Sequence, residues 1–382
     1  MPKRESPEQN VALSLNQHTI VGVSWVERVM WRRVVAVGFL SAGGLIGTVA
    51  SVSAQALTLE SVNQAVLSPP PAADRKKASQ KKSKAPAVSA AMLKAQILLD
   101  RARISPGAID GLDGENVRKA LAAFEGERGL KADGELDEEA WTKLGETSAD
   151  PVLIEYTITR EDVKGPFEKK IPQKLEAMAE LSRLPYTGPE ELLAEKFHVT
   201  EELLKALNPK KPLDEAGTRI VVPNVIEAPN KDSGAARAAR KEMKGLVGKI
   251  EVQKNARALR AFDKEGKLVA FYPASIGSDE KPAPSGDHTV RAIAENPTYT
   301  YNPEYNFKGV KADKKLTIKP GPNNPVGAVW IDLSIESFGI HGTPEPRRVG
   351  KSYSHGCGRL TNWDVKELAR MVEKGTPVAF VD

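Results

Sequence analysis

The 382-residue sequence is poor in cysteine and in aromatic residues: it contains one cysteine, and Phe, Trp and Tyr together make up 5% of it. A single cysteine excludes an intramolecular disulfide framework and a cysteine-rich zinc module. The formal net charge of +5 is small, and no base-reading motif accompanies it, so nucleic acid is not expected as a partner. With 27% charged residues the chain is neither collagen-like nor wholly disordered, and its length predicts two or three folded units.

Long apolar runs are also scarce, and the clearest one lies near the N-terminus. Arg32 and Arg33 precede a nearly uncharged stretch over residues 34–50, and the small residues of 54–56 follow it. This order is typical of a secretory signal peptide, so residues 1–56 are predicted to direct export to the periplasm or the cell wall and to be cleaved. An uncleaved N-terminal membrane anchor is the alternative, because the run is near the lower length limit for a span.

Two segments are predicted to be linkers. Residues 57–89 contain three consecutive prolines and a Lys/Ser/Ala-rich run, and residues 226–245 are rich in Ala, Arg and Lys. Neither composition buries enough apolar surface to fold alone.

Residues 90–147 are predicted to form a small three-helix domain. Apolar residues recur at helical spacing in three stretches separated by turns, namely Leu93, Ile97 and Leu98, then Val117, Leu121 and Phe124, then Trp141 and Leu144. The order Pro106-Gly107, Ile109-Asp110-Gly111, Gly129-Leu130, Asp133-Gly134 and Trp141 resembles the peptidoglycan-binding domain attached to many wall enzymes. That family usually has Gln where this sequence has Glu125, and a helical spacer is the alternative.

Residues 150–225 are predicted to form a small α/β segment. Its second half contains two short apolar helices, a Thr200 N-cap, an Asn-Pro turn and a strand over residues 218–222. This order is similar to the lysin motif, a short fold that binds wall glycan, although the usual Gly-Asp-Thr near the start is absent. His198, between the two helices, is expected at the surface or at a helix end.

Residues 246–382 are predicted to be mostly β with one late helix, so the whole chain is expected to be a multidomain α+β protein. Apolar runs bounded by turns predict strands over Lys249–Val252, Ala258–Phe262, Lys267–Ile276, His288–Ile293, Leu316–Ile318, Val329–Leu333 and Gly339–His341. Val365, Leu368, Ala369 and Val372 share one helical face. Thr361 or Asn362 is the predicted N-cap of this helix, and Gly375 is its predicted end.

The only cysteine lies in a Gly-rich turn before this helix, within Ser354-His355-Gly356-Cys357-Gly358-Arg359. Glycine on both sides lets backbone N–H groups approach a bound carbonyl closely, as an oxyanion hole requires. The N-terminus of the following helix is expected to favour the thiolate of Cys357. These features indicate a nucleophile rather than a buried structural thiol.

A cysteine nucleophile needs a base, and two histidines are near it in the sequence. His355 is too close along a tight turn for its ring to face the sulfur squarely. His341 ends a predicted strand and is expected to reach across, with the carbonyl of Gly342 as a candidate partner that fixes its tautomer. Zinc bound by His341, His355 and Cys357 is the alternative, but this spacing matches no common zinc module, so no metal is expected.

The paired motif resembles the signature of the L,D-transpeptidase catalytic domain: His341-Gly342-Thr343, then Ser354-His355-Gly356-Cys357-x-Arg359-Leu360. Residues 321–327 are similar to the Pro/Asn/Gly loop of that family, and Pro284-Ser285-Gly286 is similar to its Thr-Pro-x-Gly loop. Ala283, Val326 and Gly358 depart from the usual residues, but none of these changes removes a catalytic group.

The resemblance implies a β-sandwich-like fold and acyl transfer on peptidoglycan stem peptides, without a cofactor. Cys357 would attack the bond between the diamino acid and D-Ala of a tetrapeptide stem, and His341, oriented by the Gly342 carbonyl, would donate and accept the proton. The Gly356 N–H would hold the oxyanion. Substrate binding would involve Tyr353, Ser354, His355 and Arg359, although a structural ion pair is the alternative for Arg359.

Two further functions stay open from the sequence. One is a non-catalytic protein that only binds the cell wall, and the other is a Cys/His hydrolase that cuts existing cross-links. The expected partners are the stem peptides and glycan of peptidoglycan, together with the membrane if the N-terminal anchor is kept.

Overall fold

The computed structural model describes residues 57–67, 88–225, 241–277, 282–305, 314–352 and 356–382, all within the compact unit Ala54–Asp382. The predicted signal or anchor lies outside the described residues, as do residues 68–87 of the first predicted linker and 226–240 of the second. None of the described helices is long and apolar enough to cross a membrane.

The first part of this unit is helical, as predicted, with α1 (Leu59–Asn63), α2 (Ala90–Arg101), α3 (Glu115–Glu127) and α4 (Glu138–Gly145). Asp137 caps α4, since its carboxylate accepts the backbone N–H of Ala140 at 2.8 Å. The apolar positions that predicted the three-helix domain are buried together: Leu93, Ile97, Leu98, Val117, Leu121, Phe124 and Leu144.

The predicted linker over residues 57–89 is wrong in its first part. Helix α1 lies there, and its Val62 is fully buried in the same core as α2 and α3. The Asn63 amide forms two hydrogen bonds with the backbone of Leu153, at 3.0 and 2.8 Å. The apolar residues of this short stretch have a partner only in the folded protein, which is why its composition alone suggested a tether.

The middle region is a two-stranded antiparallel sheet with four helices between its strands. Its elements are β1 (Leu153–Thr157), α5 (Arg160–Lys164), α6 (Leu175–Ala179), α7 (Pro189–Lys196), α8 (Glu201–Leu207) and β2 (Arg219–Pro223). Thr200 caps α8, and its hydroxyl accepts the Leu203 N–H at 3.2 Å. The resemblance of this region to the lysin motif stays a prediction.

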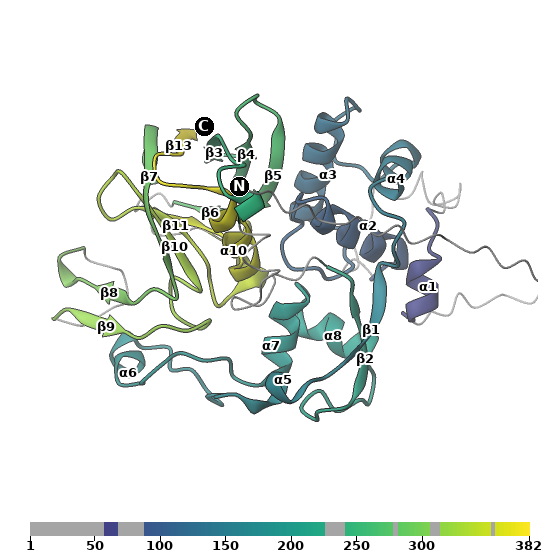
Figure 1. The fold of residues 1–382 in the computed structure, drawn as a ribbon, viewed down its shortest axis with the longest axis horizontal. Coiled ribbons are helices and arrows are strands. Elements are labelled where there is room, and N and C mark those ends of the chain that lie inside the picture. Colours follow the sequence, from purple (N-terminus) through teal and green to yellow (C-terminus); the bar gives the residue numbers. More distant parts are fainter. Residues whose placement is uncertain (1–56, 68–87, 226–240, 278–281, 306–313, 353–355) are drawn as a thin grey trace, which may run out of the picture. The chain divides into compact units, whose positions relative to one another are not determined.

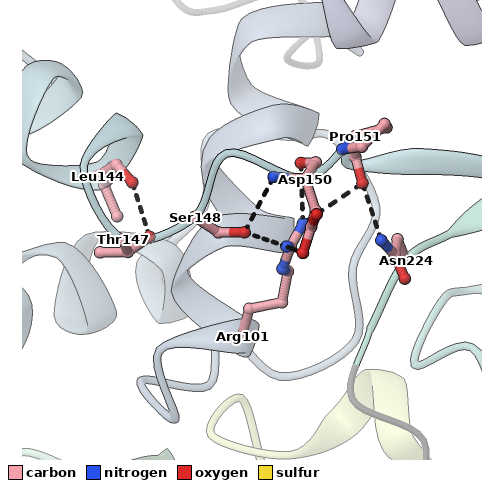
Figure 2. Close-up of polar contacts among 7 residues, drawn as sticks. All are labelled: Arg101, Leu144, Thr147, Ser148, Asp150, Pro151 and Asn224. Carbon is pink, nitrogen blue, oxygen red and sulfur yellow. Dashed lines mark hydrogen bonds and ion pairs between the residues drawn. The ribbon is translucent and has the colours of Figure 1, made fainter. Parts of the chain in front are cut away.

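Arg101, in the last turn of α2, joins the helical domain to the middle region (Figure 2). Its guanidinium donates to the carbonyls of Asp150 and Pro151, each at 3.3 Å, and to the hydroxyl of Ser148. Asn224, directly after β2, donates to the same Pro151 carbonyl at 3.0 Å. The connection between the two parts is therefore hydrogen-bonded from both sides.

The C-terminal part is built on a nine-stranded sheet in the order β5-β4-β3-β13-β7-β10-β11-β12-β6 (Figure 1). Its strands are β3 (Lys249–Gln253), β4 (Ala258–Phe262), β5 (Leu268–Pro273), β6 (Ser275–Ile276), β7 (Gly286–Glu295), β10 (Val329–Leu333), β11 (Gly339–His341), β12 (Gly358–Arg359) and β13 (Pro377–Val381). The pairs β3/β13 and β11/β12 are parallel, and the other neighbours are antiparallel. Every predicted strand is present, although the run predicted over Lys267–Ile276 forms two strands, β5 and β6. The strands β12, β13 and Tyr299–Tyr301 are additions.

A second, two-stranded sheet of β8 (Tyr299–Tyr301) and β9 (Leu316–Ile318) carries its own small core. Helix α6 of the middle region packs on β9, and Leu175 and Met178 line the same core as Tyr301 and Ile318. The C-terminal sheet residues and the middle region therefore share a hydrophobic cluster.

Helix α10 (Asn362–Met371) packs against β10 and β11 (Figure 1). Thr361 is its N-cap, as one of the two predicted candidates, and accepts the Asp364 N–H at 3.1 Å. The predicted end at Gly375 is wrong, because the helix stops at Met371 and Val372 is already extended. Val372 is 2% exposed, so its side chain stays in the core while the backbone turns toward β13.

Candidate active site

The two predicted catalytic residues come from neighbouring parallel strands. In the pairing of β11 with β12, Ile340 lies opposite Gly358 and His341 opposite Arg359, and Cys357 directly precedes β12. Paired residues project from the same face of a sheet, and side chains alternate along a strand. His341, Arg359 and Cys357 therefore lie on one face, although sixteen residues separate the histidine from the cysteine.

His341 is buried, with 5% of its surface exposed, and its Nδ1 lies 2.7 Å from the carbonyl oxygen of Gly342. A carbonyl only accepts, so Nδ1 carries the hydrogen and Nε2 keeps a free lone pair. Burial, followed by the charge of Arg359, lowers the pKa of His341 to about 3. The imidazole is therefore neutral near pH 7 and able to accept a proton at Nε2.

The side chain of Asn362 approaches Gly342 and Gly327 more closely than any residue with a Cβ would permit. A Cβ at Gly342 would lie 2.2 Å from Oδ1 of Asn362, and a Cβ at Gly327 would meet the same atom at 2.2 Å. Asn362 Oδ1 accepts the backbone N–H of Ala328 at 3.0 Å. Asn362 thus ties the loop after β11 to the loop before β10.

The same asparagine is anchored from the middle region. Its Nδ2 donates to the Glu195 carboxylate of α7 at 2.8 Å, and Glu195 also accepts from Lys366 and from the Tyr186 hydroxyl, each at 2.8 Å. These cationic and neutral donors hold the pKa of the buried Glu195 carboxyl low against the effect of burial. The sequence named Asn362 only as a cap candidate and gave no signal for Glu195, since 167 residues separate the two.

The pKa of the Cys357 thiol is raised, whereas the sequence predicted that the thiolate would be favoured. Burial raises the pKa of Cys357, and a hydrogen bond from the Gly339 backbone and the charge of Arg359 only partly oppose this. The expected help from a helix N-terminus is wrong, because β12 separates the cysteine from α10, which begins at Asn362. The resting side chain is therefore a thiol that needs a base.

The turn around the cysteine requires its first glycine but not its second. Gly356 has φ +103°, and a Cβ there would lie 2.7 Å from the Phe338 ring. Gly358 pairs with Ile340 and Ile276 in the sheet, and a Cβ would meet Ile340 at an ordinary 3.5 Å. Gly358 is therefore held between two strands.

The predicted substrate-binding residues are only partly described. Tyr353, Ser354 and His355 lie outside the described residues. Burial lowers the pKa of Arg359, and its Nε has no hydrogen-bond partner within the described part of the chain. Tyr299 of β8 lies near the cysteine, since burial and then the charge of Cys357 raise its pKa to about 12. The sequence gave no role to Tyr299.

A second cluster of buried titratable groups lies on α10, where α2 and the end of α7 meet it. His198 directly follows Phe197, the C-cap of α7, so it lies at a helix end, as one of the two expectations had it. It is not at the surface: its side chain is 15% exposed, its Nδ1 lies 3.0 Å from Asp100 Oδ2, and it stacks on Trp363 with 5.1 Å between ring centroids. Burial raises the pKa of the neighbouring Asp364 to about 8. These residues line a cavity of about 590 Å³.

The comparisons with known proteins identify the domains that this chain resembles. Residues 248–379 match the L,D-transpeptidase catalytic domain, and residues 89–144 match a peptidoglycan binding domain. A Bacillus licheniformis protein named L,D-transpeptidase YkuD is 29% identical over 192 residues, which is 50% of this chain and 92% of the relative. An Escherichia coli protein named probable L,D-transpeptidase YbiS is 32% identical over 124 residues, 32% of this chain and 40% of the relative.

Among solved structures, the catalytic domain of the Enterococcus faecium L,D-transpeptidase is 25% identical and covers 35% of this chain and 97% of its own, with a TM-score of 0.28. The assignment rests on the family models. The C-terminal part of this chain is an L,D-transpeptidase catalytic domain. It follows a peptidoglycan-binding domain, and the two together indicate an enzyme that acts on peptidoglycan.

Proposed function

We propose that the protein is an exported peptidoglycan L,D-transpeptidase. Cys357 attacks the bond between the diamino acid and D-Ala of a tetrapeptide stem, releases D-Ala and passes the acyl group to an amine acceptor or to water. The observation that supports this most is the buried, neutral His341, whose Nδ1 is bound to the Gly342 carbonyl and which shares a sheet face with the only cysteine.

In the acylation half of the reaction, Nε2 of His341 takes the thiol proton while the sulfur of Cys357 attacks the carbonyl carbon. The tetrahedral intermediate collapses as the C–N bond to D-Ala breaks. The leaving amine takes the proton from His341, so free D-Ala departs and a thioester remains. Because burial raises the pKa of Cys357, this proton transfer must accompany the attack rather than precede it.

In the second half, an amine of another stem attacks the thioester and gives its proton to the neutral His341. The thiolate leaves and is reprotonated by the same imidazole, which restores both groups. An amine acceptor gives a 3→3 cross-link, and water gives carboxypeptidase action. The N–H groups of Gly356 and Cys357 would stabilise the oxyanion in both halves.

Substrate recognition is proposed for the residues around the cysteine. Arg359 would meet a stem carboxylate, because its buried guanidinium has a free Nε among the described residues. Tyr353, Ser354 and His355 would complete this part of the site. The peptidoglycan-binding domain and the middle region would hold the glycan, and the N-terminal segment would bring the chain to the periplasm or the cell wall.

The test is to incubate the purified protein with a disaccharide tetrapeptide and to measure D-Ala release together with the masses of the products. Release that is lost in Cys357→Ala and His341→Gln, with 3→3 dimers as products, supports transfer. His288→Gln is the matched control, since His288 lies in the same sheet opposite Val378 and away from Cys357. It should release D-Ala at the rate of the unchanged protein.

Two other functions would give different results. A non-catalytic wall-binding protein would release no D-Ala with any acceptor. A Cys/His hydrolase would lower the amount of existing dimers without releasing D-Ala. A carbapenem offers an independent probe, because the resemblance implies that it acylates the nucleophile. Intact mass should show one adduct, absent in Cys357→Ala, and no adduct on the unchanged protein would contradict the proposal.

A further inference from the structure

Trp330 contacts the proposed base directly. It lies opposite His341 in the pairing of β10 with β11, so the two side chains share a face. Their rings are stacked, with 5.4 Å between centroids and 18° between planes. An indole face against an imidazole restricts rotation of the smaller ring and covers one side of it.

The same indole also packs against Gly339, the first residue of β11. A Cβ at Gly339 would lie 2.5 and 2.6 Å from two atoms of the Trp330 ring, so the ring occupies the space above this glycine. The backbone of Gly339 in turn hydrogen-bonds the sulfur of Cys357. One side chain therefore packs on the base and on the backbone that contacts the nucleophile.

Trp330 is itself held in place. Its Nε1 donates to Oδ1 of Asp332 at 3.3 Å, and Oδ2 of Asp332 accepts from Nε of Arg291 on β7 at 2.5 Å. Trp330 and Asp332 are two residues apart on one strand, so they project from the same face. These two contacts fix the plane of the indole ring, which is the ring that stacks on His341.

We propose that Trp330 is a positioning residue for the reaction, which holds the ring of His341 in the plane that its Gly342 contact requires and shields it from water. The proposal rests on the proposed function of His341 as the base. Nothing in the motif around the cysteine points to Trp330, since it is brought there by the strand pairing.

The shielding has a measurable consequence. Among the residues that the structure describes, the charged group that acts on His341 is Arg359 and the polar group that binds it is the Gly342 carbonyl, while burial is the largest influence on the imidazole. Removing the aromatic face admits water and reduces the desolvation that keeps the imidazole neutral. The pKa of His341 should then rise, and the acid limb of the acylation rate should move to higher pH with it.

The experiment compares Trp330→Phe with Trp330→Leu in the full chain. Phenylalanine keeps an aromatic face and loses the indole N–H, whereas leucine keeps an apolar side chain and loses the ring. The readouts are the titration of the histidine rings by NMR, with His341 assigned from His341→Gln, and the rate of carbapenem adduct formation measured by intact mass. Both start about one unit below the pKa of His341, which is about 3, and extend to neutral pH.

We expect Trp330→Leu to raise the pKa of His341 by about one unit and to slow acylation about ten-fold or more. Trp330→Phe should stay close to the unchanged protein in both. A merely structural role would lower the thermal unfolding midpoint of both variants without moving the titration. If the two folded variants titrate and react alike, the positioning role is overturned.

Asp332→Ala provides a second route if Trp330→Leu does not fold, because it keeps the ring but removes the acceptor of its N–H. It should move the pKa of His341 in the same direction by a smaller amount, and no movement would overturn the proposal. The NMR titration needs no substrate. A failure of the proposed function, with no D-Ala release and no adduct, is therefore separable from a failure of this inference.

Discussion

Two buried histidines in this protein each stack on a tryptophan, but the charged groups around them have opposite signs. His341 stacks on Trp330 and His198 stacks on Trp363, at centroid distances of 5.4 and 5.1 Å. Yet the pKa of His341 is lowered to about 3, whereas the pKa of His198 is raised. Burial and stacking are common to both, so they do not explain the difference.

The sign is decided by the charge that each ring meets. Burial lowers the pKa of His341, the guanidinium of Arg359 lowers it further, and the hydrogen bond to the Gly342 carbonyl opposes them only in part. Burial also opposes the charge on His198, but Asp100 outweighs it through its charge and its hydrogen bond, with smaller contributions from Asp364 and Glu367. One fold therefore contains a histidine that is neutral near pH 7, with a free lone pair on Nε2, and a histidine whose charged form is favoured. Only the first suits a general base.

The strongest test of this difference is to remove each ring in turn. His341→Gln should reduce the rate of D-Ala release or of carbapenem acylation about 10²- to 10⁴-fold, because the thiol loses its proton acceptor. His198→Gln should leave the rate unchanged per folded molecule and lower the thermal unfolding midpoint instead. Equal rate losses in the two variants would contradict the separate roles of the two histidines.

Asp100→Asn should break the ion pair between Asp100 and His198. The raised pKa of His198 means that its contribution to stability is present below the unfolded pKa of about 6.5 and is lost as pH rises through the folded value. The variant should lose about 1.5–3 kcal/mol near pH 6 and less near pH 9. Thermal unfolding of both proteins across this range measures it, with Glu202→Gln, which removes an exposed carboxylate, as the control. A difference that is constant with pH would count against the charge pair.

Asp364→Asn tests a second buried carboxyl group of the same cluster. The pKa of Asp364 is raised to about 8 by burial and then by Asp100, although His198 and hydrogen bonds from Thr361 and Ser105 act the other way. Its contribution to stability is present below about pH 4 and is lost as pH rises to about 8. The asparagine variant should therefore gain stability relative to the unchanged protein over this window, by about 1–3 kcal/mol. Thermal unfolding of both proteins at pH 5 and at pH 8 measures this gain. If the stability difference between the two proteins is the same at both pH values, Asp364 ionises as freely in the folded protein as in the unfolded chain, and the prediction fails.

Glu125→Gln, in the peptidoglycan-binding domain, should give the smallest effect. Burial raises the pKa of Glu125, and the charges of Asp133 and Asp137 add to this, although its carboxylate accepts the Gly134 N–H at 2.9 Å. Glutamine keeps an acceptor for this N–H and removes the ionisation. The unfolding midpoint should become less dependent on pH above about 5, with a gain of less than about 1 kcal/mol near pH 7. A loss of stability in the variant would show that the charge itself is needed.

Much of the fold followed from local patterns. The strands over Ala258–Phe262, Leu316–Ile318 and Val329–Leu333 begin and end where their apolar runs predict, because each run is bounded by turn residues. Strand β12 was missed because two residues between glycine and leucine carry no periodic signal. Strand β13 was missed although its apolar run Val378–Val381 was a usable signal, since the predicted end of the preceding helix lay too close to it.

The residues of the candidate site also fall into those that the sequence named and those that it did not. Cys357, His341 and the Gly342 carbonyl come from motifs in which each residue type carries its own chemistry, so the sequence named them. Trp330 and Glu195 have no such signal, because what they do depends on strand pairing and on a contact across 167 residues. The raised pKa of Cys357 was missed for the same reason, since burial is a property of the packed chain.

By itself the sequence determined the order of the domains, most of the strands and the residue pair that performs the proposed chemistry, because these depend on side-chain type and on spacing along the chain. The tertiary structure decided the protonation state of each buried group and the residues that contact His341. Both depend on which charges and rings come within a few ångströms. The sequence places a histidine near a cysteine, and only the fold makes that histidine neutral.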